Sequence, residues 1–326
     1  MFPVGAYLAA LFGAFIITSL VMPFWIRWCT RIGLVDEPGA RKIHDSAIPL
    51  AGGLALLTGI AIPLIAGASV IQFGWLQTDG LEELQHGILR RGQQLLIILF
   101  GAASMAAIGW LDDKHELPAR TKFFGQVIVA IFVALSGTKI TLFVHNDIFA
   151  YAITVLWIVS VTNALNFLDN MNGLCAGLGA IAAVAFGIIA VIHGQYLVAI
   201  FCLLTCGSLF AFLPFNYPKA SAFLGDSGSH LIGYLLAILA ILPDFHSASN
   251  PKAWAVLTPL LILGVPLLDM AWVVINRLRH GQPFYLGDTT HISHRLVKLG
   301  FSKTKAVAFV WVIGLFCAFA AVLLNR

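Results

Sequence analysis

The sequence predicts an all-α protein that crosses a membrane several times, and three observations support this. The chain has 326 residues, of which 60% are hydrophobic and 10% charged, with a mean hydropathy of +0.92. A soluble chain averages about 25% charged residues. The apolar runs are long and do not alternate with polar residues, which excludes a β-barrel. Because only helices and closed barrels satisfy their backbone in lipid, we expect these runs to be helices.

Ten runs are long enough to cross a bilayer, which takes about 20 mainly apolar residues. We expect them to form one integral membrane domain over residues 1–326, with no zinc spacing among the scattered cysteines. The first run has no charged leader or cleavage site, so we expect it to be retained. The expected spans are 3–26, 48–69, 93–111, 122–138, 149–168, 174–192, 196–213, 228–243, 253–274 and 305–324.

The distribution of basic residues predicts the orientation of the chain. The odd-numbered loops, with Lys122 and Lys305 at their edges, hold fourteen of the nineteen Lys and Arg residues. Basic loops stay on the cytoplasmic side of a membrane. We therefore expect these loops inside and both termini outside. The odd loops are 27–47, 112–121, 169–173, 214–227 and 275–304.

Five polar clusters fall on this same predicted inner side. They are RKIHDSAIPLAGG (41–53), LDDK (111–114), NALNFLDNMNG (163–173), FNYPKASAFLGDSGS (215–229) and GDTTHISHR (287–295). We expect one functional site mainly because all five clusters lie on the same predicted side of the membrane.

The cluster NALNFLDNMNG carries amides and an acid at the end of an expected span. Asn163, Asn166, Asp169 and Asn170 lie within about 120° of one another on a helix, and Asn172 falls in the turn before a glycine. Such residues in a membrane helix are costly unless they face protein, water or ligand. This favours a polar site, with hydrogen bonding between helices as the alternative.

The adjacent acids Asp112 and Asp113 end another span, where negative charge opposes the helix dipole. One interpretation is a solvated ion cluster with Lys114, Arg120 and Lys122. The other is a site that uses negative charge to handle a metal or a proton.

Asp226 opens the span that follows it. An isolated Asp at a helix start is usually an N-cap. Here small residues surround it, and a helix N-terminus attracts anions, so Asp226 is also a candidate to hold a divalent cation that bridges to phosphates.

His291 and His294 are three residues apart and share one face of a helix. No third ligand completes a metal pattern, and a surface pair is the alternative. The flanking Arg277, Arg279 and Arg295 favour phosphate recognition. The clusters together favour Mg²⁺-assisted chemistry on a phosphorylated cytosolic nucleotide, with a lipid as the second substrate.

Five motifs occur in an order that resembles one enzyme family, the polyprenyl-phosphate N-acetylhexosamine-1-phosphate transferases of glycosyltransferase family 4. This family includes the WecA-like enzymes and the MurNAc-pentapeptide transferase MraY. The resemblance covers about residues 35–305. It rests on Arg41, Lys42, His44, Pro49, Gly52 and Gly53; on Asp112, Asp113 and Lys122; on Asn163, Asn166, Asp169, Asn172 and Gly173; on Phe223, Gly225, Asp226, Gly228 and Ser229; and on Asp288, His291, Ile292, Ser293, His294 and Arg295.

Two positions depart from the bacterial pattern. Asn172 stands where many bacterial members have Asp, although the eukaryotic enzyme has Asn, and an amide can still pair with a uracil edge. Ser293 replaces the middle His of the usual H-x-H-H. The loop also lacks the triple His and following Phe-Glu of the MurNAc-pentapeptide enzyme, which argues against that substrate.

The resemblance implies transfer of an N-acetylhexosamine 1-phosphate, most simply GlcNAc-1-phosphate, from a UDP-sugar to undecaprenyl phosphate, with UMP released. This would be the first lipid-linked step of a cell-envelope polysaccharide, at the cytoplasmic face of a bacterial inner membrane. The resemblance further implies Mg²⁺, with Mn²⁺ as a substitute, and a homodimer. No feature indicates nucleic-acid binding.

The resemblance also implies roles for individual residues. The expected metal ligands are Asp226 and Asn166. The expected catalytic residues are Asp112, which positions or deprotonates the lipid phosphate, with Asp113, Lys122, Asp169, His291 and His294. The expected substrate-binding residues are His44, Asn163, Asn166, Asn172, Phe223, Arg277 and Arg295, with Phe223 stacking on uracil and Arg277 joining Lys122 on the phosphates.

Two other classes of membrane protein fit the sequence less well. An intramembrane aspartyl protease shares the Gly225–Asp226 pair, but position 223 is Phe where that class has Gly. An ion-coupled transporter usually shows internal symmetry and broken helices near the midplane, and neither is clear in this sequence.

Overall fold

A computed structural model of the chain describes residues 4–38, 46–73, 81–141, 144, 146–243, 245, 252–283 and 290–325. Helices dominate these residues, and the one sheet is a ladder of two-residue strands that pair antiparallel. The elements are α1 (Val4–Arg31), β1 (Val35–Asp36), β2 (Ile48–Pro49), α2 (Gly52–Gln72), α3 (Leu81–His115), α4 (Ala119–Leu135), α5 (Asp147–Leu168), α6 (Leu174–Ile192), α7 (Tyr196–Asn216), α8 (Gly225–Ile241), the 3₁₀ helix η1 (Ala253–Leu257), α9 (Thr258–Ile262), α10 (Gly264–Arg279), α11 (Ile292–Lys298) and α12 (Lys303–Leu324).

The expected class, an all-α polytopic membrane protein, is confirmed. Over the described residues, seven helices are long and apolar enough to cross a membrane, namely α1, α2, α3, α5, α6, α7 and α12. The η1–α9 segment and α10 form an eighth span if the pair, bent by 70°, is counted as one. Helices α4 and α8 have 17 residues each. The count of about ten spans therefore stays a prediction.

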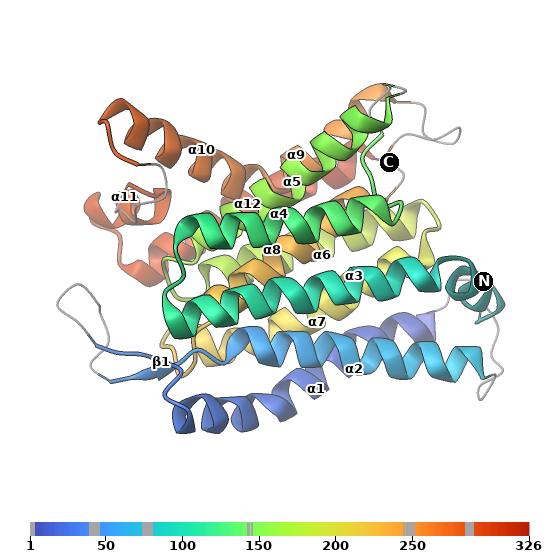
Figure 1. Ribbon diagram of the computed structural model, residues 1–326, viewed down its shortest axis with the longest axis horizontal. Helices are drawn as coiled ribbons and strands as arrows, with labels where there is room; N and C mark the ends of the chain where they lie inside the picture. Colours follow the sequence, from blue (N-terminus) through green and yellow to red (C-terminus); the bar gives the residue numbers. More distant parts are fainter. Residues whose placement is uncertain are drawn as a thin grey trace.

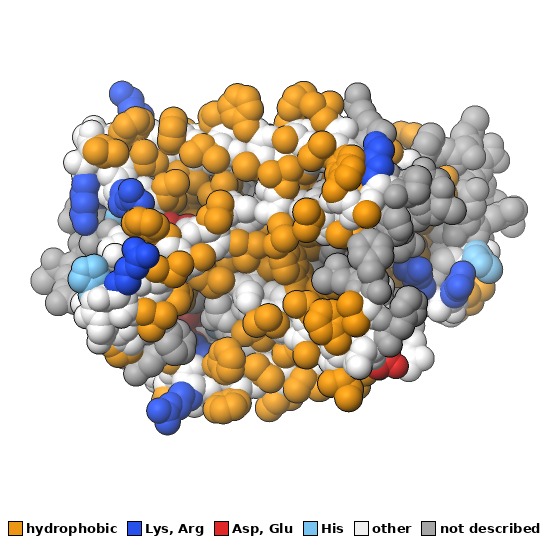
Figure 2. Space-filling view, turned by 90° about the horizontal axis from the view of Figure 1, so that it is seen from above, with side chains coloured by type: hydrophobic (Ala, Val, Ile, Leu, Met, Phe, Trp, Pro, Cys, Tyr) orange, Lys and Arg blue, Asp and Glu red, His pale blue; other side chains and the backbone are white. Residues whose placement is uncertain are grey.

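The helices are arranged as expected for a protein in a lipid slab. Most run along the long axis of the molecule, with both termini at one end and β1 and α11 at the other (Figure 1). Hydrophobic side chains cover the middle of the face in Figure 2, and Lys and Arg side chains lie toward its two ends. An apolar belt between basic ends matches a hydrocarbon layer between two polar surfaces.

Helix α8 lies at the centre of the bundle. Every residue from Ser227 to Ala240 is buried, and the helix packs against α2, α3, α5 and α6. Glycines on the neighbours allow this close approach, as is common between membrane helices. A Cβ on Gly109 of α3 would overlap the backbone of Asp226 and Ser227. The packing thus brings the end of α3 against the start of α8.

A groove runs beside the bend between α9 and α10. Its volume is about 370 Å³. Its lining is mostly apolar and comes from α9, α10, α11 and α12: Leu260, Leu261, Gly264, Val265, Leu268, Asp269, Trp272, Ile292, Arg295, Ile313 and Cys317. The bend opens this space because the chain turns by 70° between Ile262 and Gly264.

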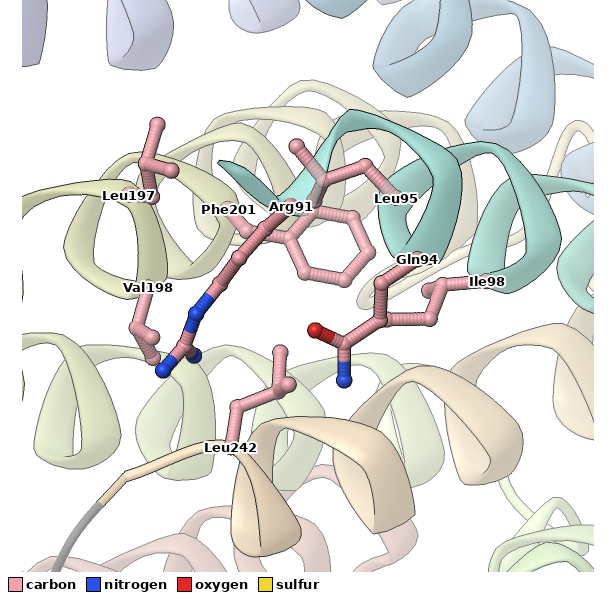
Figure 3. A pocket seen from close by; sticks show the side chains of 8 residues that line it. All are labelled: Arg91, Gln94, Leu95, Ile98, Leu197, Val198, Phe201 and Leu242. Carbon is pink, nitrogen blue, oxygen red and sulfur yellow. The ribbon is translucent and has the colours of Figure 1, made fainter. Parts of the chain in front are cut away.

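Figure 3 shows a second, much smaller cavity, lined by residues of α3 and α7 and by Leu242. Arg91 and Gln94 of α3 face apolar side chains of α7 and Leu242 there, around a space of about 20 Å³. This is room for about one water molecule. At 1.5 Å per residue, Arg91 lies about 30 Å along α3 from Asp112, so this cavity is separate from the candidate site.

Candidate active site

Asp112 uses both of its carboxylate oxygens within the protein. Its Oδ1 accepts a hydrogen bond from the backbone N–H of Leu117 at 2.7 Å, and its Oδ2 accepts one from Lys122 Nζ at 2.5 Å. The side chain is buried, at 7% exposure. Asp112 therefore fixes the turn from α3 to α4 and directs Lys122 into the site.

Asp113 has a different partner. Its two oxygens accept hydrogen bonds from the backbone N–H groups of Asp226 at 2.7 Å and Ser227 at 3.1 Å. The first N–H groups of a helix have no partner inside that helix, and Asp113 supplies two of the missing acceptors from another helix. Gly225 adopts φ +68° here, and a side chain on it would collide with the Asp113 carboxylate, so glycine is required.

Asp226 joins three helices at the start of α8. Its Oδ2 accepts from Lys122 Nζ at 3.2 Å, and its Oδ1 accepts from Asn166 Nδ2 at 2.9 Å. Asn166 also donates to Ser229 Oγ at 2.9 Å. Lys122 is thus an ammonium group held between two carboxylates, those of Asp112 and Asp226. An ammonium group can bind phosphate oxygens, and the adjoining carboxylates can bind a divalent cation.

The other polar residues at the end of α5 point to different places. Asn163 donates to Gln126 Oε1 at 2.6 Å, one turn deeper than Asn166. Asn170 accepts from Ser293 Oγ at 2.6 Å, and Asn172 donates to the carbonyl of Pro218 at 3.2 Å. Three of the residues that the helical wheel placed on one face, Asn163, Asn166 and Asn170, therefore have separate side-chain partners.

Asp169 follows the last residue of α5. Burial, together with the negative charges of Asp226 and Asp113, raises the pKa of Asp169 to about 8. A raised pKa favours the protonated form of this carboxyl group, which can donate a hydrogen bond.

A second cluster lies across the end of α5 from the acids. His291 Nδ1 contacts Asp269 Oδ2 at 2.7 Å, and the backbone N–H of Ile292 donates to the other Asp269 oxygen at 2.7 Å. The ring of Phe167 lies 5.1 Å from the Arg277 guanidinium and 6.3 Å from the His291 ring. Phe167, which contacts the basic cluster, directly follows Asn166, which belongs to the acidic cluster. The two clusters are therefore contacted by adjacent residues of α5.

His294 and Arg295 lie on α11 next to this cluster. The His294 ring is 6.3 Å from that of His291. Partial burial and the charges of His291, Lys298 and Lys303 lower the pKa of His294, which favours its neutral form. Arg295 stacks on Trp272 at 4.9 Å and lines the apolar groove.

Phe223 belongs to the segment that leads into α8. Its backbone N–H donates to the carbonyl of Pro49 at 3.0 Å, and its carbonyl accepts from Gly52 at 2.9 Å. These bonds tie the start of α2 to the start of α8. Among the predicted residues of the motifs, Arg41, Lys42, His44 and Asp288 lie outside the described residues.

The acidic cluster fits a cation that is shared with a substrate. In the described part of the chain, no group of three or more His, Cys, Asp or Glu side chains is arranged to hold a metal ion alone. Mg²⁺ is commonly bound by one or two carboxylates together with water and substrate phosphates. A carboxylate has about four lone-pair positions, and Lys122 and Asn166 occupy two on Asp226. Asp226 therefore remains able to bind such an ion.

Sequence reasoning missed three polar residues near the site: Asp269, Gln126 and His230. All are buried, at 6%, 1% and 1% exposure. Asp269 is an acid within an expected span, and such a residue is by itself a signal of function. Gln126 and His230 follow Lys122 and Asp226 by four residues, a spacing that places each pair on one helix face.

Comparison with known proteins agrees with this geometry. The family model "Glycosyl transferase family 4" matches residues 95–244, which include the acidic cluster. A probable undecaprenyl-phosphate N-acetylglucosaminyl 1-phosphate transferase of Bacillus subtilis is 32% identical over 99% of this chain and 85% of its own length.

Two further relatives have similar names. A decaprenyl-phosphate N-acetylglucosaminephosphotransferase of Mycobacterium tuberculosis is 30% identical, over 87% of this chain and 74% of its own. An undecaprenyl-phosphate alpha-N-acetylglucosaminyl 1-phosphate transferase of Escherichia coli is 28% identical, over 92% and 79%. With a relative above 30% identity matched along nearly the whole chain, and with motif residues from four helices assembled around Lys122, this protein belongs to glycosyl transferase family 4.

Proposed function

We propose that this protein transfers N-acetylglucosamine 1-phosphate from UDP-GlcNAc to a polyprenyl phosphate, with undecaprenyl phosphate as the first candidate. The named activity of its relatives supports this reaction class. The observation that carries the proposal is the position of Lys122 between Asp112 and Asp226, with Asn166 completing the cluster. This arrangement joins a phosphate-binding cation to a carboxylate that can hold a metal.

The reaction exchanges one phosphoanhydride for another. An oxygen of the lipid phosphate attacks the sugar-bearing phosphorus of UDP-GlcNAc. The bond from that phosphorus to the bridging oxygen breaks, and UMP leaves with the electron pair. Because a pyrophosphate is consumed and another is formed, the equilibrium lies near unity and UMP drives the reverse reaction.

The residues of the acidic cluster would bring two anions together. Asp226 and Asn166 would hold Mg²⁺, or Mn²⁺ in its place. The ion would supply neutralisation of the pyrophosphate charge that grows in the transition state. Lys122 and Arg277 would bind phosphate oxygens, and Asp113 and Asp169 would support the cluster from behind. The positive charge of Lys122 and Arg277 is needed because both substrates are anionic.

Asp112 would act on the lipid phosphate through Lys122 rather than deprotonate it. Both of its oxygens are already engaged, by Leu117 and Lys122. A phosphate monoester has a second pKa near 6, so most of the acceptor is a dianion at neutral pH without help from a base. The role of Asp112 is then to hold Lys122.

The remaining predicted residues would bind the nucleotide and sugar. Phe223 would stack on uracil with Asn172 at its edge. His44, Asn163 and Arg295 complete the predicted substrate-binding set, and His291 and His294 complete the predicted catalytic set.

The apolar groove supports a lipid acceptor. Its lining includes Asp269 and Arg295, beside the basic cluster, together with apolar residues of α9 and α12. The excess of basic residues in the odd loops supports a cytoplasmic position for the site, with both termini outside. A bacterial cytoplasmic membrane is the setting in which UDP-sugars and this lipid meet.

Purified protein, undecaprenyl phosphate, Mg²⁺ and radiolabelled UDP-GlcNAc test the proposal. Label that moves into the organic phase, with one UMP released per lipid labelled, is the expected result. Competition with UDP-GalNAc and UDP-MurNAc-pentapeptide then identifies the sugar. Label that stays in the aqueous phase with all three donors would overturn the proposal.

A further inference from the structure

A second layer of polar residues lies one helical turn below the acidic cluster. Gln126 follows Lys122 by four residues on α4, Asn163 precedes Asn166 by three on α5, and His230 follows Asp226 by four on α8. These spacings place each deeper residue on the same helix face as the site residue above it. The layer is defined as Gln126, Asn163 and His230, and it is called the inner layer below.

Hydrogen bonds connect the inner layer across three helices. Asn163 Nδ2 donates to the carbonyl of Val159 at 2.8 Å and to Gln126 Oε1 at 2.6 Å. Gln126 Nε2 then lies 3.3 Å from His230 Nε2. The layer thus joins α4, α5 and α8, the helices that carry Lys122, Asn166 and Asp226.

The donors and acceptors allow only one form of His230. A carbonyl oxygen accepts only, so the contact with Val159 fixes the amide of Asn163. The contact between Asn163 and Gln126 then fixes the Gln126 amide with its NH₂ group toward His230. Since that group only donates, His230 Nε2 must accept, and the single ring proton lies on Nδ1. His230 is therefore neutral.

Two members of the inner layer are shielded from solvent, and Asn163 is partly buried. Gln126 and His230 are each 1% exposed, and His230 Nδ1 has no hydrogen-bond partner among the residues that the structure describes. Apolar side chains could fill this space without the need to satisfy buried polar groups. A hydrogen-bonded layer has the advantage that it accepts only one rotation of each helix about its axis.

We propose that the inner layer positions the acidic cluster, by fixing the rotation of α4, α5 and α8 so that Lys122, Asn166 and Asp226 meet. Gln126 and His230 are positioning residues that act through the residues one turn above them. The inference rests on the proposed transferase function for its kinetic test and on the structure alone for its stability test.

Three substitutions at His230 test the proposal. His230→Gln keeps an acceptor near the position of Nε2, His230→Asn keeps a polar group only near Nδ1, and His230→Leu keeps neither. We expect His230→Leu and His230→Asn to lower kcat at least about tenfold with less than about threefold change in KM for UDP-GlcNAc, because misplaced groups weaken the transition state more than the ground state. His230→Gln should recover to within about threefold of wild type.

Tyr234→Phe is the matched control. Tyr234 lies one turn further along α8, is fully buried and donates to the carbonyl of Ile98 at 3.0 Å. Its loss removes a buried hydrogen bond from the same helix without touching the inner layer. We expect kcat within about twofold of wild type even where the melting temperature falls as it does for His230→Leu.

A double-mutant cycle separates this inference from the function. His230→Leu and Lys122→Met are combined, and thermal unfolding in detergent is measured for the four proteins. If the inner layer and the acidic cluster are coupled, the double variant loses less unfolding free energy than the sum of the losses in the two single variants. If wild type transfers no label, the proposed function fails while the cycle still tests the layer. Additive effects in the cycle, or a kcat for His230→Leu equal to that of Tyr234→Phe, would overturn the inference.

Discussion

Asp113 caps a helix that begins far from it in the chain, by accepting the backbone N–H of Asp226, 113 residues later, at 2.7 Å. Its neighbour Asp112 faces the other way and holds Lys122. Two adjacent acids at the end of α3 therefore have separate tasks. One fixes where α8 starts, and the other fixes the cation that meets the first carboxylate of α8.

Replacement of Asp113 tests the cap. Asp113→Ala leaves two buried N–H groups of α8 without an acceptor, so we expect a loss of about 1–3 kcal/mol in unfolding free energy and a fall in activity. Asp113→Asn keeps one acceptor and should lie between wild type and Asp113→Ala. Asp147→Asn, an exposed acid paired with Lys139, is the control. Equal melting temperatures for Asp113→Ala and Asp147→Asn would contradict the cap.

Two glycines of α3 test the contact between α3 and α8. A Cβ on Gly109 would overlap the backbone of Asp226 and Ser227, whereas Gly92 has open space around its Cβ position. We expect Gly109→Ala to cost about 1–3 kcal/mol through overpacking and to lower activity with it. Gly92→Ala should be neutral or stabilising by up to about 1 kcal/mol, since alanine favours a helix. Similar melting curves and rates for both variants would show that α8 does not need this contact.

The class of fold and the acidic cluster could be predicted because both leave strong patterns in the sequence. Long apolar runs identify membrane helices, and polar groups at the ends of alternate runs must meet on one side. The pairing of Asp113 with the N–H groups of Asp226 and Ser227 could not be predicted in this way. It depends on the close approach of α3 and α8 at Gly109, and no pattern of neighbouring residues in the sequence predicts that approach.

The three polar residues that the sequence analysis did not identify were missed for another reason. Asp269 and Gln126 are single polar residues before or within apolar stretches, and His230 lies just beyond the motif that ends at Ser229, so no motif includes any of the three. Their partners come from other parts of the chain: His291 for Asp269, Asn163 for Gln126, and Gln126 for His230. A search for single polar residues three or four positions from motif residues would have found Gln126 and His230.

Removal of the Lys122 charge tests the centre of the cluster. Lys122→Met leaves the carboxylates of Asp112 and Asp226 without their shared cation. We expect a loss of at least about 100-fold in kcat, the size typical of a group that stabilises transition-state charge. Lys139 lies on the loop before α5 and pairs with the exposed acid Asp147. Lys139→Met should therefore keep wild-type kcat. Full activity in Lys122→Met would exclude the assigned role.

The pH dependence of stability tests the environment of Asp169. Its pKa is raised to about 8 in the folded chain, against about 3.9 for an unperturbed Asp. Between these values the native state binds more protons than the unfolded state, so stability falls as pH rises from about 4 to 8 and then levels off. Asp169→Asn removes this contribution, so thermal unfolding in detergent and chelator should depend less on pH in the variant. Asp147→Asn should keep the wild-type dependence. An unchanged pH profile in Asp169→Asn would mean that Asp169 is ionised at neutral pH and that the neighbouring acids do not act on it as described.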